Sequence, residues 1–240
     1  MQFAQELIGI QLSPRQLEAF QIYERELLDW NRLINLTAIK EPEMIRIKHF
    51  LDSLTCLLAM QDLQIERLID VGTGAGFPGI PIKIAIPKIK LTLVESVKKK
   101  RDFCAHIVDK LGLTDVNIIW DRAENIGHLD EHRERYDCSV ARAVASMAVL
   151  AEYLLPLTKV GGIMIAMKGE NAPTETYRAE DVIRILGGRI HRILPITLPK
   201  VAEQRYLVLV DKIALTPQKY SRRAGIPEKH PLQTFNQYNK

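Results

Sequence analysis

The sequence predicts an α/β fold with a mostly parallel sheet that is covered by helices on both faces. Short apolar runs typical of buried strands alternate with helical patterns, as in right-handed strand–helix–strand crossovers. The chain has 240 residues, of which 47% are hydrophobic, so it can bury a sizeable core. The expected parallel strands are 67–71, 91–95, 116–120, 136–141 and 162–167.

Two further strands are expected after these five. The β-rich runs 189–194 and 205–210 are separated by a proline-containing loop with no helical pattern between them. Strands joined in this way pair antiparallel, so the two runs should close one edge of the sheet. The sheet should therefore contain seven strands.

A helical region precedes the first strand. Ser13, Pro14 and Gln16 are the residue types of a helix cap followed by a first-turn proline and a capping-box partner. Apolar residues then recur at helical spacing as far as Ile34, and a second helical pattern covers 49–60. We divide the chain into a helical N-terminal extension (1–65), an α/β domain (66–212) and a basic C-terminal tail (213–240).

Composition and charge exclude several classes of protein. The first twelve residues carry an acid and no basic cluster, and the longest apolar runs are about five residues, too short for a signal peptide or a membrane span. The three cysteines are far apart, which argues against a disulfide framework or a zinc site. We therefore expect a cytoplasmic protein with no membrane contact and no metal.

The basic character of the chain is concentrated at its C-terminus. The net charge is +4, and residues 212–240 alone carry six basic side chains against one acidic side chain. Such asymmetry favours an anionic partner, with nucleic acid as the first choice. The alternative is a terminus that only keeps the protein in solution.

The most informative segment is a glycine-rich turn between a predicted strand and a predicted helix. Gly72, Gly74 and Gly76 follow the first strand, where the backbone either approaches a ligand closely or makes a tight turn without one. A dinucleotide fingerprint would need glycine in place of Phe77, and a P-loop would need a Gly-Lys-Ser/Thr ending in register. The pattern therefore favours a nucleotide-type ligand and disfavours NAD or P-loop ATP.

An acidic residue supports an adenosine ligand. Glu95 ends the second predicted strand and lies 23 residues after Gly72. A carboxylate at this point of an open α/β sheet can accept both hydroxyl protons of a ribose. Taken alone, the same residue could be a strand-end charge in water.

The glycine loop and several other segments resemble one family. The loop 70–81, with its Phe-Pro-Gly-Ile-Pro ending, is similar to that of the bacterial 16S rRNA (guanine-N7) methyltransferases, known as RsmG or GidB. This resemblance covers residues 13 to 232 and implies a Rossmann-like class I S-adenosylmethionine-dependent methyltransferase fold with a seven-stranded, mostly parallel sheet. The supporting segments, in the family's order, are 35–37, 49–54, 93–96, 122–124, 141–145 and 168–169.

The resemblance also implies a set of site residues. The cofactor S-adenosyl-L-methionine would lie along Gly72, Gly74 and Phe77, with its ribose held by Glu95, its adenine bordered by Ala123 and Glu124, and its carboxylate end facing Arg142. Asn35, His49 and Asp52 come from the helical extension and could form a lid or one wall of the RNA site, although Asn35 could equally be a helix-end residue. Arg222 and Arg223 would hold RNA from the tail, which departs from the family at Ser221 and His230.

The chemistry of guanine N7 explains why no catalytic dyad is apparent. N7 carries a lone pair and no proton, so attack on the sulfonium methyl group needs no general base and positioning should dominate. Arg122 and Lys168 are expected to position phosphate, guanine O6 or the cofactor carboxylate. The expected partner is small-subunit rRNA or the 30S particle, bound by a monomer.

Two alternatives stay open from the sequence. One is a methyltransferase that acts on another RNA or on a small molecule. The other is a non-catalytic RNA-binding module that keeps the cofactor pocket as a structural element. The segment 128–132 formally matches an inverted zinc-protease motif, but it lies in a short polar connection and not on a buried helix.

Overall fold

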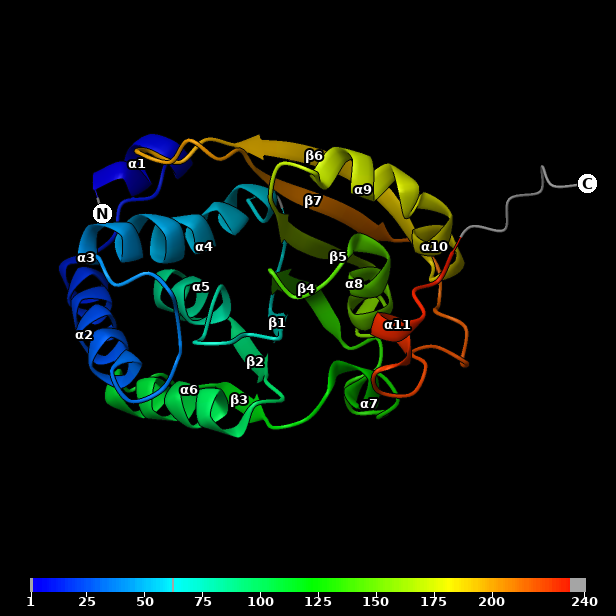
Figure 1. Ribbon diagram of the computed structural model, residues 1–240, viewed down its shortest axis with the longest axis horizontal. Coiled ribbons are helices and arrows are strands. Elements are labelled where there is room, and N and C mark those ends of the chain that lie inside the picture. The colour runs from blue at the N-terminus through cyan, green and yellow to red at the C-terminus, as the bar shows by residue number, and fades with distance from the viewer. Residues whose placement is uncertain (1, 62, 234–240) are drawn as a thin grey trace, which may run out of the picture.

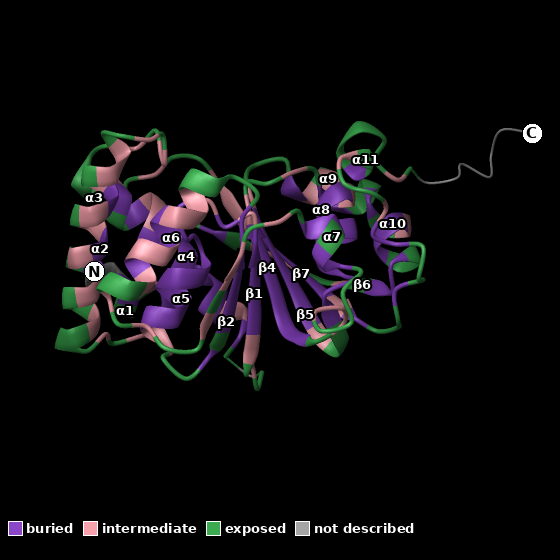
Figure 2. Ribbon diagram, turned by 90° about the horizontal axis from the view of Figure 1, so that it is seen from below, coloured by how far each residue is buried: buried purple, intermediate pink, exposed green. Residues whose placement is uncertain are grey.

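A computed structural model describes residues 2–61 and 63–233, and these form one seven-stranded sheet with helices on both faces (Figures 1 and 2). The strand order is β3-β2-β1-β4-β5-β7-β6. Strands β1 to β5 pair in parallel, and β7 is antiparallel to both β5 and β6. The strands are β1 (Arg67–Val71), β2 (Lys90–Val94), β3 (Val116–Ile119), β4 (Tyr136–Arg142), β5 (Thr158–Lys168), β6 (Gly188–Ile196) and β7 (Arg205–Lys212).

The expected α/β class and all seven strands are confirmed. The antiparallel pair closes the edge of the sheet, as the loop between its two strands predicted. The largest difference in bounds is at β5, which begins at Thr158 and not at residue 162. Two glycines, Gly161 and Gly162, lie inside this strand, and its pairing with β4 is irregular there. Glycines weaken a strand pattern in sequence, which explains the late predicted start.

The helices fall into two layers. Helices α1 to α6 cover one face of the sheet and α7 to α11 lie on the other side, with the strands buried between them (Figure 2). The first layer contains α1 (Gln2–Ile8), α2 (Pro14–Asn31), α3 (Pro42–Ile45), α4 (Asp52–Leu54), α5 (Gly79–Ala85) and α6 (Lys98–Lys110). The second contains α7 (Ala123–Ile126), α8 (Met147–Leu154), α9 (Ala172–Arg178), α10 (Glu180–Ile185) and α11 (Ile226–Lys229).

The N-terminal helices share a core with the sheet. Helix α2 begins with the predicted capping box, in which Ser13 and Gln16 bond to each other's backbone N–H. Phe20, Tyr23 and Leu27 from this helix are buried in the same apolar cluster as residues of β1, β2, α5 and α6. Burial of one apolar stripe along α2 fixes it on this face of the sheet.

The second predicted helical stretch is a compound element. Residues Arg46–Leu51 form a π-helical turn, Asp52–Leu54 an α-helical turn, and Thr55–Ala59 a 3₁₀ turn. All three turns bury apolar side chains, so the apolar pattern correctly indicated a helix without specifying its pitch. Among residues 2–61 and 63–233, no helix is both long and apolar enough to span a membrane.

Candidate active site

The glycine-rich loop occupies the carboxyl end of β1 and leads into α5. Gly72, Gly74 and Gly76 all have positive φ angles, of 68°, 62° and 93°. A Cβ on Gly72 would lie 2.7 Å from Cγ2 of Val144, and one on Gly76 would lie 2.5 Å from the Tyr23 hydroxyl oxygen. Position 72 is thus restricted by the segment after β4, and position 76 by the packing of α2 against the loop.

Asp70 holds this loop from inside the protein. Its Oδ2 accepts hydrogen bonds from the Thr73 hydroxyl (2.6 Å) and from the Gly79 backbone N–H (2.7 Å). Burial is the main cause that raises the pKa of this carboxyl group to about 6, and the two hydrogen bonds act in the opposite direction. The other oxygen, Oδ1, is buried and has no hydrogen-bond partner among the described residues.

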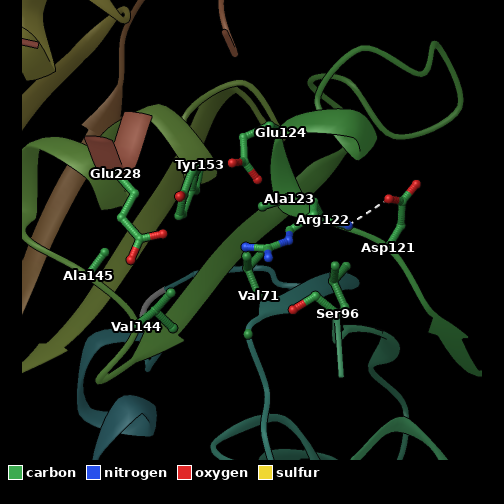
Figure 3. Close-up of a pocket in the computed structure, with 12 residues that line it drawn as sticks. Val71, Ser96, Asp121, Arg122, Ala123, Glu124, Val144, Ala145, Tyr153 and Glu228 are labelled. Carbon is green, nitrogen blue, oxygen red and sulfur yellow. Dashed lines mark hydrogen bonds between the residues drawn. The ribbon is translucent and has the colours of Figure 1, made fainter. Parts of the chain in front are cut away.

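A pocket opens beside the loop, at the carboxyl ends of β1 to β4 (Figure 3). Arg122 extends its guanidinium into this pocket, and Glu228 enters it from α11 on the opposite side (Figure 3). Apolar and polar side chains both line it, and the polar ones include the buried Glu124. The lining residues are Val71, Gly72, Val94, Ser96, Asp121, Arg122, Ala123, Glu124, Val144, Ala145, Tyr153 and Glu228.

Glu95 lies one residue beyond β2 and is buried. Its Oε2 accepts a hydrogen bond from the Gly74 N–H (2.9 Å), and its Oε1 accepts one from the Val97 N–H (2.7 Å). Each carboxylate oxygen has two lone pairs, so each retains the capacity for one further hydrogen bond. The residue therefore fixes the glycine loop and can still accept from the hydroxyl groups of a ligand.

Ala123 and Glu124 begin α7 and are buried against the pocket. The Glu124 carboxylate accepts a hydrogen bond from the Gly225 N–H (2.8 Å), which ties the C-terminal segment to the pocket wall. Burial, with the neighbouring carboxylates of Glu124 and Glu228, raises the pKa of Tyr153 to about 12. Its hydroxyl group therefore stays protonated at neutral pH and can donate a hydrogen bond.

Arg142, Phe77 and His49 form a stack between the helical layer and the end of β4. The His49 ring stacks on Phe77 with centroids 4.7 Å apart, and the Arg142 guanidinium carbon lies 5.0 Å from the Phe77 ring centroid. The same guanidinium donates to Oδ2 of Asp52 (3.0 Å). Phe77 is itself buried, so its side chain serves mainly to hold the loop against this stack.

Both ring nitrogens of His49 are occupied within the protein. The Arg142 guanidinium carries only donors, so Nδ1 of His49 accepts an N–H from Arg142 at 3.3 Å. Nε2 of the neutral ring then carries the proton, which it donates to the Thr37 hydroxyl at 2.7 Å. Burial and the nearby charges of Arg142 and Arg205 lower the pKa of His49 to about 3. The side chain is therefore neutral at physiological pH. Asn35, the other RNA candidate of this region, is exposed in the loop after α2.

Lys168 fixes the segment that separates β4 from α8. Its Nζ donates to the backbone oxygen of Ala145 (2.8 Å) and pairs with the Glu175 carboxylate (2.8 Å). Glu175 in turn accepts the N–H of Met147, at the start of α8. The lysine thus holds the chain that contributes Val144 and Ala145 to the pocket.

The two tail arginines have different environments. Arg222 pairs in bidentate fashion with Glu152, whose side chain is fully buried in α8, through N–O distances of 2.8 and 2.7 Å. Ser221 donates to the Glu152 backbone oxygen beside this pair. Arg223 is exposed and makes no salt bridge within the described part of the chain. Arg222 therefore anchors the tail, which sequence alone did not indicate.

Several lining residues were not found from the sequence. Ser96 and Asp121 follow strand ends, so their position was a usable signal. Tyr153 lies on α8, and Glu228 reaches the pocket from 133 positions beyond Glu95 along the chain, and neither belongs to a recognisable local pattern. Within residues 2–61 and 63–233, no group of three or more His, Cys, Asp or Glu side chains is placed to hold a metal ion.

Comparison with known proteins places this chain in a family. The family described as "rRNA small subunit methyltransferase G" (GidB) matches residues 16–202. The ribosomal RNA small subunit methyltransferase G of Pelotomaculum thermopropionicum is 49% identical over 94% of each chain.

Two solved structures share the fold at low sequence identity. A point mutant of the 16S rRNA (adenine(1408)-N(1))-methyltransferase from Catenulisporales acidiphilia has a TM-score of 0.54 at 14% identity, covering 63% of this chain and 87% of that one. A point mutant of MtNAS in complex with S-adenosylmethionine has a TM-score of 0.53 at 17% identity, covering 83% and 72%. The sheet topology and the sequence match agree, and the chain belongs to the ribosomal RNA small subunit methyltransferase G family.

Proposed function

We propose that this protein transfers a methyl group from S-adenosylmethionine to N7 of a guanosine in small-subunit ribosomal RNA. The observation that carries the proposal is the pocket beside the Gly72 loop, at the carboxyl edge of the sheet, in a chain of this family. The curated relative at 49% identity is named for action on small-subunit rRNA. Open α/β sheets bind their ligands at this edge, where the strand order reverses between β1 and β4.

The residues present fit the cofactor. Gly72 and Val144 both line the pocket, and the apolar side chains of Val71 and Val94 suit the face of an adenine ring. Glu95 would accept from the ribose hydroxyl groups, and Ala123 and Glu124 would border the adenine. When bound, S-adenosylmethionine supplies an electrophilic methyl group on a positively charged sulfur.

The chain's own residues contribute by positioning. Guanine N7 has a lone pair and no proton, so no side chain has to remove one. Lys168 holds the segment around Ala145, and Arg142, paired with Asp52, holds the other end of the same segment against the helical layer. Arg122 extends into the pocket and is free to meet an anionic group of the RNA or the cofactor.

The remaining features of the proposal concern the setting of the reaction. We assign the N-terminal helices to one wall of the RNA site and Arg223, with Lys98 and Lys99 at the start of α6, to phosphate contacts. The protein acts as a cytoplasmic monomer on the rRNA or the 30S particle. Exposed basic side chains of this kind supply salt-dependent affinity without reading sequence.

Calorimetry and label transfer test the proposal together. S-adenosylmethionine should bind with heat release and NAD should not. Methyl label should pass from it to small ribosomal subunits lacking the modification and not to large subunits. Binding of NAD in place of S-adenosylmethionine would overturn the cofactor assignment. Binding without transfer to any RNA would favour the non-catalytic alternative.

A further inference from the structure

A second pocket lies next to the cofactor pocket, on the far side of the segment that follows β4. Ala143 lines this second pocket, whereas Val144 and Ala145 line the first. Ala143 has a φ angle of 53°, a left-handed conformation that is unfavourable for alanine and turns the chain sharply between the two pockets. The second pocket is lined by Asp52, Thr55, Arg142, Ala143, Met167, Lys168, Gly169, Ile196, Arg205, Tyr206 and Leu207.

One side of this pocket is apolar, and polar side chains line the rest of it. Met167 and Leu207 are buried side by side in adjacent strands, β5 and β7, and belong to the apolar cluster on this face of the sheet. Such a surface suits a flat ligand with an apolar face, which gains apolar contact there. Lys168 also lines the pocket, but its ammonium is already bound to Ala145 and Glu175.

Asp52 is the one carboxylate that lines the pocket. Only 3% of this residue is exposed. Its Oδ2 accepts from Arg142, while Oδ1 has no hydrogen bond to any described residue. This carboxylate therefore keeps one oxygen with lone pairs available at the pocket, which is a strong acceptor for a ligand that brings N–H groups.

Arg205 offers a hydrogen-bond donor beside the same pocket. Its Nε is buried and has no hydrogen-bond partner within residues 2–61 and 63–233. The residue lines the same pocket as Asp52, at the beginning of β7. The pocket therefore combines one carboxylate acceptor and two guanidinium groups, of Arg142 and Arg205, with an apolar side.

Among the four RNA bases, guanine fits this set best. Its Watson–Crick edge carries adjacent N1–H and N2–H donors, both of which a carboxylate can accept. Adenine and cytosine each place a ring acceptor beside their amino group, and uracil flanks its single N–H with two carbonyl oxygens. A carboxylate repels those acceptors, so it selects guanine by repulsion as well as by attraction.

We propose that the second pocket receives the target guanine and that Asp52 reads its Watson–Crick edge. N7 lies on the opposite edge of the purine from the N1–H and N2–H groups, so this docking leaves N7 free of the carboxylate and available to the methyl donor. Asp52 is thus a specificity residue that contacts the substrate. The inference rests on the proposed function, since it assigns the base that this reaction methylates.

The first test changes the substrate and leaves the protein intact. After the labelled guanosine has been mapped, 30S subunits are reconstituted with inosine at that position, which removes only the N2 amino group. Loss of one hydrogen bond to a charged acceptor should lower kcat/KM by roughly 10- to 100-fold. Equal kcat/KM for the guanosine and inosine subunits would overturn the role of Asp52.

The second test changes the acceptor. Asp52→Asn keeps the size of the side chain and an oxygen for Arg142, but it replaces a charged acceptor by a weaker, neutral one. The guanosine-to-inosine ratio of kcat/KM should move toward one. Glu203→Gln, which removes an exposed charge paired with Lys48, is the matched control and should keep the wild-type ratio.

The outcomes separate the two proposals. No label on wild-type guanosine subunits would contradict the proposed function itself. Label on those subunits, with a ratio that is the same in Asp52→Asn and in the wild type, would overturn only the assignment of Asp52. The guanosine-to-inosine ratio of kcat/KM does not change when part of the protein fails to fold. If Asp52→Asn shows no activity, the comparison of guanosine with inosine subunits in the wild type decides the question.

Discussion

Single residues set the shape of the cofactor pocket, and Gly72 shows how. Its positive φ and the nearness of Val144 leave space only for a residue without a side chain. Gly72→Asp should abolish binding of S-adenosylmethionine, because the added carboxylate clashes with Val144 and repels the carboxylate of the ligand. Calorimetric titration measures this loss directly.

A matched control separates the pocket from backbone strain. Gly112 has a similar φ of 60°, lies after α6, and has nothing within 4 Å of a built Cβ. Gly112→Asp should therefore bind the cofactor with wild-type affinity. Intact affinity in Gly72→Asp would contradict the placement of the cofactor beside the loop.

His49 makes the stability of the protein depend on pH. Its pKa is about 3 in the folded protein and 6.5 in an ordinary environment, so between these values the unfolded chain binds the proton more readily. Stability should fall as the pH drops from 6.5 toward 3, by up to roughly 1.4 kcal/mol per pH unit. Denaturant unfolding of the wild type and of His49→Gln at several pH values measures the difference.

His49→Gln should lose the part of the dependence of stability on pH that the His49 imidazole contributes. His128→Gln, at an exposed position, should keep the wild-type slope because that side chain lies on the surface. Parallel curves for His49→Gln and the wild type across this pH range would show that the imidazole is not held neutral by its surroundings.

Sequence reasoning located some site residues and could not give others their roles. Gly72 and Glu95 follow predicted strands, and a strand end followed by a glycine turn is a local pattern. The environment of Arg142 depends on Asp52, which is 90 positions away, and that of Arg222 depends on Glu152. Such pairings form only when distant elements pack, so the pattern around each arginine could not predict them.

At the scale of elements, the C-terminal segment is a wall of the pocket more than a free basic arm. Arg222 pairs with the buried Glu152, Gly225 donates to Glu124, and Glu228 lines the cofactor pocket. Arg222→Ala leaves a buried carboxylate without its partner, which should cost about 3–5 kcal/mol of stability. The variant should also bind S-adenosylmethionine more weakly, as thermal unfolding and calorimetry would measure.

RNA binding should respond differently to the neighbouring arginine. Arg223→Ala should reduce the slope of log affinity against log salt by about 0.7–0.9 while leaving the melting temperature unchanged, since the side chain is exposed. Arg222→Ala, measured at a temperature where it is folded, should keep the wild-type slope. A reduced slope in Arg222→Ala alone would contradict the assignment of this residue to the tail anchor.

The sequence predicted strands better than it predicted the helical segment 46–59. A buried strand in a parallel sheet needs only a short apolar run between turn signals, and β1 and β2 have this pattern. The π and 3₁₀ turns place Asp52 and His49 beside Arg142, and they depend on packing against the sheet. Helical periodicity alone does not distinguish these pitches.

At the scale of the whole molecule, the N-terminal helices and the sheet form one core. Phe20 and Tyr23 of α2 share an apolar cluster with Leu93 of β2 and Phe103 of α6. Parts that share a core should unfold together. The strand topology was predictable because the rules for crossover connections leave few options. The two pockets were not predictable, because each collects side chains from four or more segments of the chain.

The two tryptophans can report on this cooperativity. Trp30 packs against Phe103 from the N-terminal layer, and Trp120 follows β3 and donates to the Ser96 backbone oxygen. In Trp30→Phe the remaining Trp120 reports on the sheet, and in Trp120→Phe the remaining Trp30 reports on the helical layer. Each fluorescence transition should coincide with that variant's own far-UV circular dichroism transition. A helical layer that melts several degrees before the sheet would contradict a shared core.

The identity of the methylated nucleoside tests the central claim most directly. Small ribosomal subunits that lack the modification are incubated with the protein and methyl-labelled S-adenosylmethionine, and the rRNA is then digested to nucleosides. The account predicts that the label appears in 7-methylguanosine from the small-subunit rRNA. Label in another nucleoside, or no label from a protein that binds S-adenosylmethionine, would contradict it.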